Sequence, residues 1–560
     1  MASDPSRALA LVLYAHQPFV LGHERWPHGS DWLCEAVTEC YLPLLDTLRS
    51  LVERGTSPQL TLSFSPVLCE QLASPLLQAE LEFFLDTRLR ACADTRRHFQ
   101  SEGQADTADL VDYWEEFYRA RLAQWRALDG DLLAAFRSLM EDGHVELMTS
   151  AATHGYLPLL AREQSVRLQL RLATVSHETH FGRRPAGMWL PECGYRPRYH
   201  WLPPVGVNRQ HHRSLRRGLE EHVAACGLAF FCVDGQSVQG VFPSLPYRAD
   251  PALVTEPPGW AGGRPAVPLS PHQTYRVASR SGTGTAKALL RDPDSSRLVW
   301  SREVGYPGDP WYLDFHKQHD PGGLKLWRVS EERAELDRKQ VYTPTRARAQ
   351  ARAHARHFAG QLAATEAGPA GLTCAAYDAE LLGHWWHEGP QWLEALYPEL
   401  DRHRIVPLTC SAALDRYPPA RTVSLPEGSW GEGGDHRTWL NKDTAWVWER
   451  LYDGEFQFWD AMQATREADR KGPLGRVLCQ AGKELLLMQA SDWPFLITTQ
   501  TARDYAEQRF LIHSTDLKRL LQLARSVRQQ GRLEAEQERF LADREQQNFL
   551  FPALEQVMFR

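Results

Sequence analysis

Short apolar runs alternate with segments of helical length along most of this chain, and the alternation limits the possible fold more than any other feature. Residues 8–14 form a continuous apolar run that leads into Ala15-His16-Gln-Pro18. Similar strand-like runs recur at 60–64, 144–148, 187–190, 228–233, 297–300, 371–376 and 403–408. Strands that alternate with helices over about 400 residues favour a parallel α/β architecture, and a barrel is its most economical form.

The strand pattern is interrupted once and later stops. Apolar residues at helical spacing predict helices through most of 74–140, at 451–470 and from 501 onwards. We therefore expect a barrel built from residues 1–198 and 265–415, a small inserted subdomain at 199–264, and an α-helical C-terminal domain at 416–560.

Two unusual stretches lie in and directly after the predicted insertion. Residues 209–217 hold a basic patch that includes Arg213 and Arg216 but no interleaved aromatic residues, so a solvated face explains it better than nucleic-acid binding. Residues 234–272 are rich in glycine and proline and contain Tyr247. A long aperiodic stretch inside a globular chain is usually functional or disordered. Our hypothesis for this second stretch is a lid over a cleft.

Charge and cysteine usage exclude several classes of protein. The formal net charge of −7 provides no basic field for nucleic acid or anionic membranes, and no run approaches the length of a membrane span. Ten scattered cysteines without a CxxC pair argue against a zinc cluster or a disulfide framework. The N-terminus lacks the layout of a signal peptide, so we expect a cytoplasmic protein.

The first candidate catalytic residue is Glu192, in the stretch Met188-Trp-Leu-Pro-Glu192-Cys-Gly-Tyr-Arg-Pro197. An apolar strand ends at Pro191, and a single carboxylate then stands on a turn framed by prolines. Turns at the C-terminal ends of barrel strands carry the chemistry of α/β barrels. The alternative is an acidic turn residue that pairs with Arg196. The sequence shows no base that could activate Cys193 as a nucleophile, so a thiol that takes no part in catalysis is the simpler interpretation.

A second candidate, Asp378, stands at the end of the apolar run 371–376. If a helix follows, Glu380, His384 and His387 share one of its faces, so a metal site is an alternative to a catalytic acid. The segment is not an HExxH motif, however, and no third histidine or thiolate completes a ligand set. We therefore predict no metal here.

Two carboxylates at the ends of barrel strands are the smallest set of groups that glycoside chemistry needs. The sequence leaves open whether the reaction retains or inverts the anomeric configuration. The chain also has 19 tryptophans, several of them in polar, glycine-rich stretches where their rings can stack on sugars. Phosphate-binding loops and GxSxG elbows are missing from the sequence, so phosphoryl transfer and serine hydrolysis have no support.

These motifs together resemble glycoside hydrolase family 57, and within it most closely the 1,4-α-glucan branching enzymes. The resemblance covers nearly the whole chain. It is carried by the following blocks: Ala15-His-Gln-Pro18, Gly143-His-Val-Glu-Leu-Met148, Ala152-Thr-His-Gly-Tyr-Leu-Pro158, Trp189-Leu-Pro-Glu192, Val299-Trp-Ser301, Gly305-Tyr-Pro-Gly-Asp309, Tyr377-Asp-Ala-Glu-Leu-Leu-Gly-His-Trp-Trp386, Glu427-Gly-Ser-Trp-Gly431, Gly434-Asp-His-Arg-Thr-Trp-Leu-Asn441 and Ala490-Ser-Asp-Trp-Pro-Phe495. The last three blocks separate branching enzymes from the family's amylases and 4-α-glucanotransferases.

The resemblance implies a (β/α)7 barrel, an incomplete TIM-like barrel, with a small inserted domain and a helical C-terminal domain. It makes Glu192 the nucleophile and Asp378 the general acid/base of a retaining transglycosylase. This enzyme would cleave an α-1,4 bond and transfer the chain to a glucan 6-hydroxyl, with no cofactor. Its partners would be α-1,4-glucan donors and acceptors such as amylose and glycogen.

The resemblance also implies contacts with the substrate. The residues that match the family's sugar-binding positions are His16, Trp26, His154, Tyr247, Trp300, Trp430, Trp439 and Asp492, with Tyr247 as a lid tyrosine that shields the intermediate. This chain departs from the family at Tyr14, where the family usually has a histidine. The change affects the subsite that would bind the donor sugar, because a tyrosine is longer and stays uncharged near neutral pH. A family α-amylase or 4-α-glucanotransferase, or a glucan-binding homologue with little activity, is the alternative function.

Overall fold

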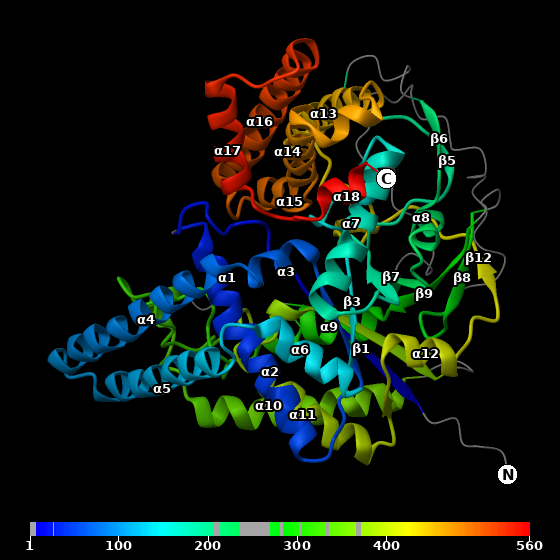
Figure 1. The fold of residues 1–560 in the computed structure, drawn as a ribbon. Helices are drawn as coiled ribbons and strands as arrows, with labels where there is room; N and C mark the ends of the chain where they lie inside the picture. Colours follow the sequence, from blue (N-terminus) through cyan, green and yellow to red (C-terminus); the bar gives the residue numbers. More distant parts are fainter. Residues whose placement is uncertain are drawn as a thin grey trace. The chain divides into compact units, whose positions relative to one another are not determined.

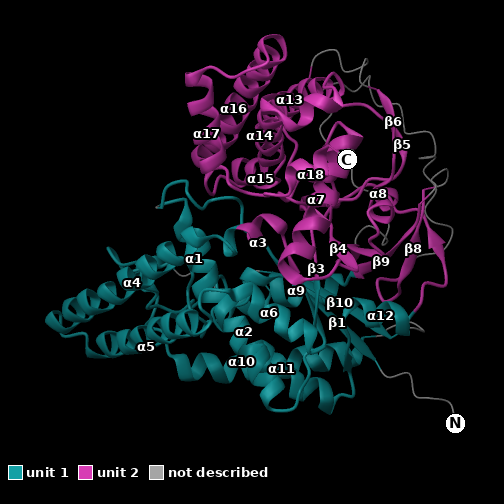
Figure 2. Cartoon of the chain, in the orientation of Figure 1, with its two compact units in different colours: residues 1–62, 71–147, 291–417 teal, residues 63–70, 148–290, 418–560 magenta. Residues whose placement is uncertain are grey.

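A computed structural model of the 560-residue chain describes residues 7–25, 27–206, 213–235, 269–279, 284–301, 304–331, 335–365 and 371–559. Trp26 and Tyr247 lie outside these residues, as do most of the predicted lid and part of the basic patch. The chain divides into two compact units. Unit 1 comprises residues 1–62, 71–147 and 291–417, and unit 2 comprises 63–70, 148–290 and 418–560 (Figure 2).

Among the described residues, seven strands of a ten-stranded sheet form the barrel (Figure 1). They are β1 (Ala8–Ala15), β2 (Leu60–Phe64), β3 (Val145–Met148), β4 (Gly187–Trp189), β7 (Phe230–Asp234), β9 (Ala286–Arg291) and β10 (Leu372–Asp378). All residues of β1, β2, β4 and β7 are buried, as expected for parallel strands that are covered on both faces. The sequence predicted six of the seven strands from their apolar runs.

The strand pairings follow the order of a nearly closed barrel. In unit 1, β1 pairs in parallel with β10 from Ala8↔Leu372 to Tyr14↔Asp378, and the sheet continues from β1 to β2 and β3. In unit 2, a bridge from Thr149 to Met188 links the end of β3 to β4, and β4 pairs in parallel with β7. Strand β7 pairs with β9, whose last residue pairs with β10. This order confirms the predicted (β/α)7 barrel.

Unit 1 contains most of the helices that the sequence predicted between 74 and 140. Figure 1 shows α4 (Pro75–Ser101) and α5 (Ala105–Ala127) side by side as a long hairpin. The other helices are α1 (Ser30–Ala36), α2 (Leu42–Glu53), α6 (Leu132–Glu141), α9 (Pro293–Trp300), α10 (Pro344–Ala364), α11 (Gly389–Arg402) and α12 (Cys410–Arg416). A short strand, β11 (Val406–Pro407), stands where the run 403–408 predicted one.

Unit 2 ends in a group of helices, as the sequence predicted for residues after 416. They are α13 (Ala445–Gln463), α14 (Pro473–Met488), α15 (Asp492–Thr499), α16 (Arg503–Gln530), α17 (Ala535–Gln547) and α18 (Leu554–Met558). Helix α14 is buried along most of its length and packs against α16. Earlier in this unit are α7 (Glu163–Phe181) and α8 (Leu219–Ala225), and α3 (Pro66–Leu72) spans the boundary of the units.

The strand predicted at 297–300 is wrong. These residues end helix α9, and the strand is β9, which precedes it. Asp292 caps the helix because its carboxylate accepts from Ser295 N at 2.7 Å, and Pro293 fits the first helical turn. The apolar residues 298–300 at the helix end favour a strand, but the capping signals decide the structure.

The predicted inserted subdomain contains both local and barrel elements. Strands β5 (Tyr199–Trp201) and β6 (Ser214–Arg216) form a separate antiparallel pair, whereas β7 belongs to the main sheet. Strand β8 (Tyr275–Val277) pairs with β9 and with β12 (Thr422–Val423). The domain boundaries at 199, 264 and 416 remain predictions.

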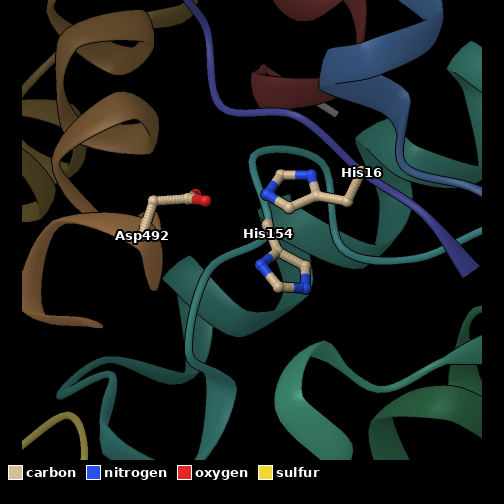
Figure 3. Close-up of side chains that lie close together, drawn as sticks. All are labelled: His16, His154 and Asp492. Carbon is tan, nitrogen blue, oxygen red and sulfur yellow. The ribbon is translucent and has the colours of Figure 1, made fainter. Parts of the chain in front are cut away.

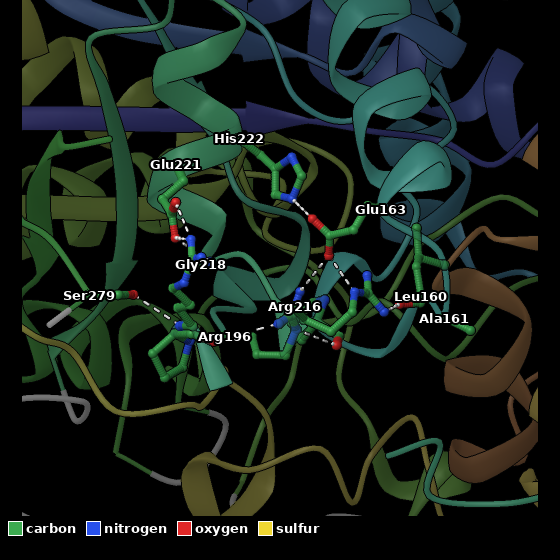
Figure 4. A network of polar contacts seen from close by, with 12 residues as sticks. Leu160, Ala161, Glu163, Arg196, Arg216, Gly218, Glu221, His222 and Ser279 are labelled. Carbon is green, nitrogen blue, oxygen red and sulfur yellow. Dashed lines mark hydrogen bonds and ion pairs between the residues drawn. The ribbon is translucent and has the colours of Figure 1, made fainter. Parts of the chain in front are cut away.

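The predicted solvated face of the basic patch is wrong for Arg216. Its guanidinium is 1% exposed, forms an ion pair with Glu163 at the start of α7, and donates to the carbonyl of Leu160 at 2.8 Å (Figure 4). His222 contacts the other Glu163 oxygen at 2.7 Å. Burial opposes ionisation of Glu163, but His222 and Arg216 together hold the pKa of this carboxyl well below its usual range.

In the part of the chain that the structure describes, no helix is long and apolar enough to span a membrane. The ten cysteines are all free thiols, and nine of them are buried.

Candidate active site

Glu192 stands on a strained turn directly after β4. Residues Pro191–Cys193 form a single 3-10 turn in which Glu192 has a φ of 60° and Cys193 a φ of 50°. Left-handed conformations in non-glycine residues cost on the order of 1–3 kcal/mol and cluster at functional sites. The turn is held by bonds from Cys193 N to Leu190 O and from Gly194 N to Pro191 O, both 2.9 Å. The fold therefore fixes the direction of this carboxylate.

Both oxygens of Glu192 accept a hydrogen bond from residues far along the chain. The Trp430 indole Nε1–H donates to Oε2 at 2.7 Å, and the Ser491 hydroxyl donates to Oε1 at 2.8 Å. The Trp430 backbone N–H also donates to the Glu192 carbonyl at 3.0 Å. Donors aimed at both oxygens stabilise the ionised carboxylate and hold it in one orientation.

The alternative pairing of Glu192 with Arg196 is not supported by the position of that arginine. Arg196 is fully buried, and its Nε donates to the carbonyl of Pro158 at 3.1 Å. Its Nη2 lies 4.0 Å from a carboxylate oxygen of Glu163. The guanidinium is thus engaged with α7 and the segment before it.

His154 contacts Glu192 through Ser491. It follows β3, is 3% exposed and also has a left-handed φ of 57°. Its Nδ1 lies 2.7 Å from Ser491 Oγ and 3.8 Å from Glu192 Oε1, so only the first distance is a hydrogen bond. A His154 ring nitrogen and a carboxylate oxygen of Asp492, the first residue of α15, lie within 4.8 Å of each other. Figure 3 shows these two side chains, together with His16 of unit 1.

The two predicted sugar-binding tryptophans of unit 2 differ in exposure. Trp430 is half-buried and contacts Trp189 edge-on, with ring centroids 5.3 Å apart. Trp439 is 1% exposed and stacks on Tyr156 at 4.5 Å. Because packing covers its ring, Trp439 supports the wall of the site in this structure, and a direct sugar contact by Trp439 remains a prediction.

A buried polar chain lies next to these rings. The Tyr156 hydroxyl contacts His436 Nδ1 at 2.7 Å, and His436 Nε2 contacts Glu427 at 2.8 Å. Glu427 also accepts from the Tyr199 hydroxyl at 2.6 Å. Burial raises the pKa of Tyr156 and of Tyr199 well above the usual value, so both phenols stay neutral.

In unit 1, Asp378 is the last residue of β10 and lies opposite Tyr14 of β1 in the sheet register. The His16 backbone N–H donates to Glu380 Oε1 at 2.9 Å, and the Tyr41 hydroxyl donates to the same oxygen. The rings of Tyr14 and His16 stack at 6.0 Å. Burial raises the pKa of Glu380. This carboxyl therefore ties the segment after β1 to the segment after β10, next to Asp378.

The helical face proposed for Glu380, His384 and His387 is wrong. Only residues Ala379–Leu381 form a helical turn, and the chain then bends through Gly383, whose φ is 110°. His384 Nδ1 contacts Glu39 at 2.7 Å, whereas His387 contacts the Tyr113 hydroxyl at 2.6 Å. The three side chains have separate partners, so this segment does not present them as a metal-binding face.

Trp300 of unit 1 is the most exposed tryptophan among the predicted sugar-binding residues that the structure describes. It is 44% exposed and contacts Trp385, itself 39% exposed, edge-on at 5.8 Å. The structure thus groups Glu192, His154, Trp430, Trp439 and Asp492 in unit 2, and places His16, Trp300 and Asp378 in unit 1. Sequence reasoning missed Ser491, although the block Ala490-Ser-Asp492 contains it.

Comparisons with known proteins identify the family of this chain. Residues 10–426 match the model of glycosyl hydrolase family 57, and residues 457–559 match that of the C-terminal region of 1,4-alpha-glucan branching enzymes. A 1,4-alpha-glucan branching enzyme of Thermococcus kodakarensis is 35% identical over 525 residues, which cover 91% of this chain and 73% of the relative.

Solved structures are also similar to this chain over nearly its whole length. The GH57-type branching enzyme of Pyrococcus horikoshii has a TM-score of 0.87 at 34% identity, with 99% of this chain and 97% of that chain covered. The α-amylase AmyC of Thermotoga maritima has a TM-score of 0.77 at 26% identity, with 99% of each chain covered. With the matching family model spanning most of its length, the chain belongs to glycosyl hydrolase family 57.

Proposed function

We propose that this protein is a 1,4-α-glucan branching enzyme, a retaining transglycosylase that makes α-1,6 branches in a glycogen-like polymer. The observation that carries the proposal is Glu192, a carboxylate on a strained strand-end turn with a donor on each oxygen. The match of the C-terminal helices to branching enzymes supports branching as the outcome.

The proposed reaction has two half-reactions. Glu192 attacks the anomeric carbon of an α-1,4-linked residue, and Asp378 gives its proton to the departing glycosidic oxygen. An acceptor glucan then presents its 6-hydroxyl, whose proton goes to the Asp378 carboxylate while the bond from C1 to Glu192 breaks. The electron pair of that bond returns to Glu192. Two carboxylates suffice for these steps, so the proposal needs no metal or cofactor.

The proposed substrate contacts are those that the family resemblance implies. They are His16, Trp26, His154, Tyr247, Trp300, Trp430, Trp439 and Asp492. Histidine and carboxylate groups suit sugar hydroxyls, and exposed rings such as Trp300 suit sugar faces. The cytoplasm is the proposed location, in keeping with ten free thiols.

One assay separates this proposal from the alternatives. The protein is incubated with amylose, and iodine colour, reducing ends and chains released by isoamylase are measured. Branching lowers iodine absorbance with few new reducing ends and yields short chains only after debranching. An α-amylase raises reducing ends, a 4-α-glucanotransferase redistributes chain lengths without branches, and a glucan-binding protein changes no bonds.

The catalytic roles are tested by isosteric variants. Glu192→Gln and Asp378→Asn should each lower branching by at least about 1000-fold, because each removes a group that takes part in bond making. Asp453→Asn, an exposed carboxylate of α13, is the matched control and should keep full activity. Substantial branching by Glu192→Gln contradicts the assignment of the nucleophile.

A further inference from the structure

Ser491 is held against Glu192 by a rigid stretch of backbone. Residues 489–491, between α14 and α15, pair antiparallel with residues 154–156. Tyr156 N donates to Gln489 O at 3.2 Å, and Ser491 N donates to His154 O at 3.0 Å. Ser491 itself is fully buried. Its hydroxyl therefore occupies a fixed position relative to His154.

The two contacts of the hydroxyl define the direction of its hydrogen bonds. A carboxylate only accepts, so the single Ser491 proton points to Glu192 Oε1. The 2.7 Å contact with His154 must then be a bond from Nδ1–H to Ser491 Oγ. The result is a chain of donors from His154 through Ser491 to Glu192, and such chains polarise each bond towards the negative end.

This chain interacts differently with the two covalent states of Glu192. Hydrogen bonds to an ionised acceptor are roughly twice as strong as those between neutral groups. The free enzyme carries a Glu192 carboxylate, whereas the glycosyl-enzyme carries a neutral ester. The chain therefore stabilises the free carboxylate over the ester, and its effect grows as charge returns to Glu192 during release of the sugar.

We infer that Ser491 is a positioning residue that promotes the second half-reaction, in which the chain leaves Glu192 for its acceptor. The inference rests on the proposed role of Glu192 as the nucleophile. The acceptor oxygen forms its bond to C1, the bond from C1 to Glu192 breaks, and its electron pair returns to the carboxylate beside the Ser491 hydroxyl. The acceptor proton goes to Asp378, so Ser491 keeps its own proton throughout.

The test measures how much enzyme is trapped as the covalent intermediate. Wild type, Ser491→Ala, Ser491→Cys and Ser491→Thr are each held at steady state on saturating maltooligosaccharide and quenched in acid. Intact-protein mass spectrometry then gives the glycosylated fraction, and peptide mapping locates the adduct. Ser165→Ala is the matched control, since Ser165 is also buried and its hydroxyl accepts from Trp459 Nε1 at 2.9 Å.

We expect the ratio of glycosylated to free enzyme to rise about tenfold in Ser491→Ala, while kcat falls by a similar factor. Ser491→Cys should show a smaller rise because a thiol is a weaker donor, and Ser491→Thr should restore the wild-type ratio. Ser165→Ala should match wild type. Cysteine keeps a side-chain group in the place of the hydroxyl, so its result decides the question if the alanine variant does not fold.

The inference is overturned if kcat falls in both Ser491→Ala and Ser491→Cys while the ratio of glycosylated to free enzyme stays the same or falls. The hydroxyl would then only maintain structure. Failure of the proposed function has a different signature. In that case Glu192→Gln keeps branching activity, or the adduct maps to a residue other than Glu192 in every variant.

Discussion

Trp430 illustrates how one residue combines two kinds of contact. Family resemblance assigns its ring to sugar binding, and the structure adds an indole N–H that donates to Glu192 Oε2 at 2.7 Å. The indole is steadied by its edge contact with Trp189, the last residue of β4. The candidate nucleophile and its donor are thus attached to the same strand, Glu192 through the backbone and Trp430 through packing.

Trp430→Phe separates the two contacts, because phenylalanine keeps an aromatic face but has no N–H. Loss of a hydrogen bond to a charged group predicts a kcat for branching about 10- to 100-fold lower, with a much smaller change in KM. Trp459→Phe is the control, since it removes an indole donor that serves Ser165 instead. Steady-state kinetics on amylose are the measurement, and an unchanged kcat in Trp430→Phe refutes the role.

Glu455 on α13 predicts a pH dependence of stability. It is fully buried and accepts from Ala161 N at 2.7 Å, and burial raises its pKa to about 7. A carboxyl whose folded pKa is raised stabilises the protein fully below its unfolded pKa of 4.5, and this contribution is lost as pH rises through 7.

Glu455→Gln keeps an acceptor for Ala161 and cannot ionise. The free energy of unfolding of this variant is compared with that of wild type at pH 5 and at pH 8. The difference in favour of the variant should be larger at pH 8 by on the order of 1–3 kcal/mol. Denaturant unfolding at both pH values checks this. A difference between the two proteins that does not vary with pH contradicts the prediction.

At the scale of elements, the pairing of β4 with β7 depends on a glycine. Gly187 lies opposite Phe230 in the register, and a Cβ at Gly187 would meet the Phe230 ring at 2.3 Å. Phe230 is 1% exposed, so its ring has little room to move. Because β4 leads directly to Glu192, close packing here positions the candidate nucleophile.

Gly187→Ala should therefore lower the free energy of unfolding by about 1–3 kcal/mol through overpacking. Gly360→Ala provides a control of opposite sign, since Gly360 lies within α10 and a Cβ there meets nothing within 4 Å. That variant should be stabilised by about 0.5–1 kcal/mol. Thermal and denaturant unfolding give both values, and equal stability of Gly187→Ala and wild type refutes the packing argument.

Elements with one dominant local signal could be predicted from the sequence. Strand β1 is a pure apolar run, and α4 and α5 have helical spacing. Strand β9 was missed because Lys287 and Arg291 break its apolar pattern, while the capping residue Asp292 made the next segment a helix. The turn after Asp378 was missed because its geometry depends on distant partners, such as Glu39 for His384.

At the scale of the whole molecule, the C-terminal helices are part of the same compact unit as the β4 region. Unit 2 joins residues 418–560 to 148–290, and both donors to Glu192 come from the later segment. Motifs in the sequence singled out Glu192 as a candidate nucleophile. They did not reveal Ser491 as its partner, because a hydrogen bond across 299 residues has no local pattern.

A chain that ends at Tyr417 tests the predicted boundary at 416. If the barrel were independent of the helical region, this chain would fold alone. Because unit 2 crosses the boundary, we expect instead a chain with a broad or absent unfolding transition and no branching activity. Circular dichroism melts and the iodine assay are the measurements. A cooperative transition like that of the full chain contradicts the expectation.

The antiparallel contact of residues 154–156 with 489–491 also has a consequence for synthesis in the cell. At about 5–20 residues per second, a ribosome needs roughly 15–60 seconds to proceed from Glu192 to Ser491. Until Trp430 and then Ser491 have been added, the nascent chain carries the Glu192 carboxylate without its full pair of donors. We expect unfinished chains to be inert towards stored polysaccharide, so that activity begins only near the end of translation.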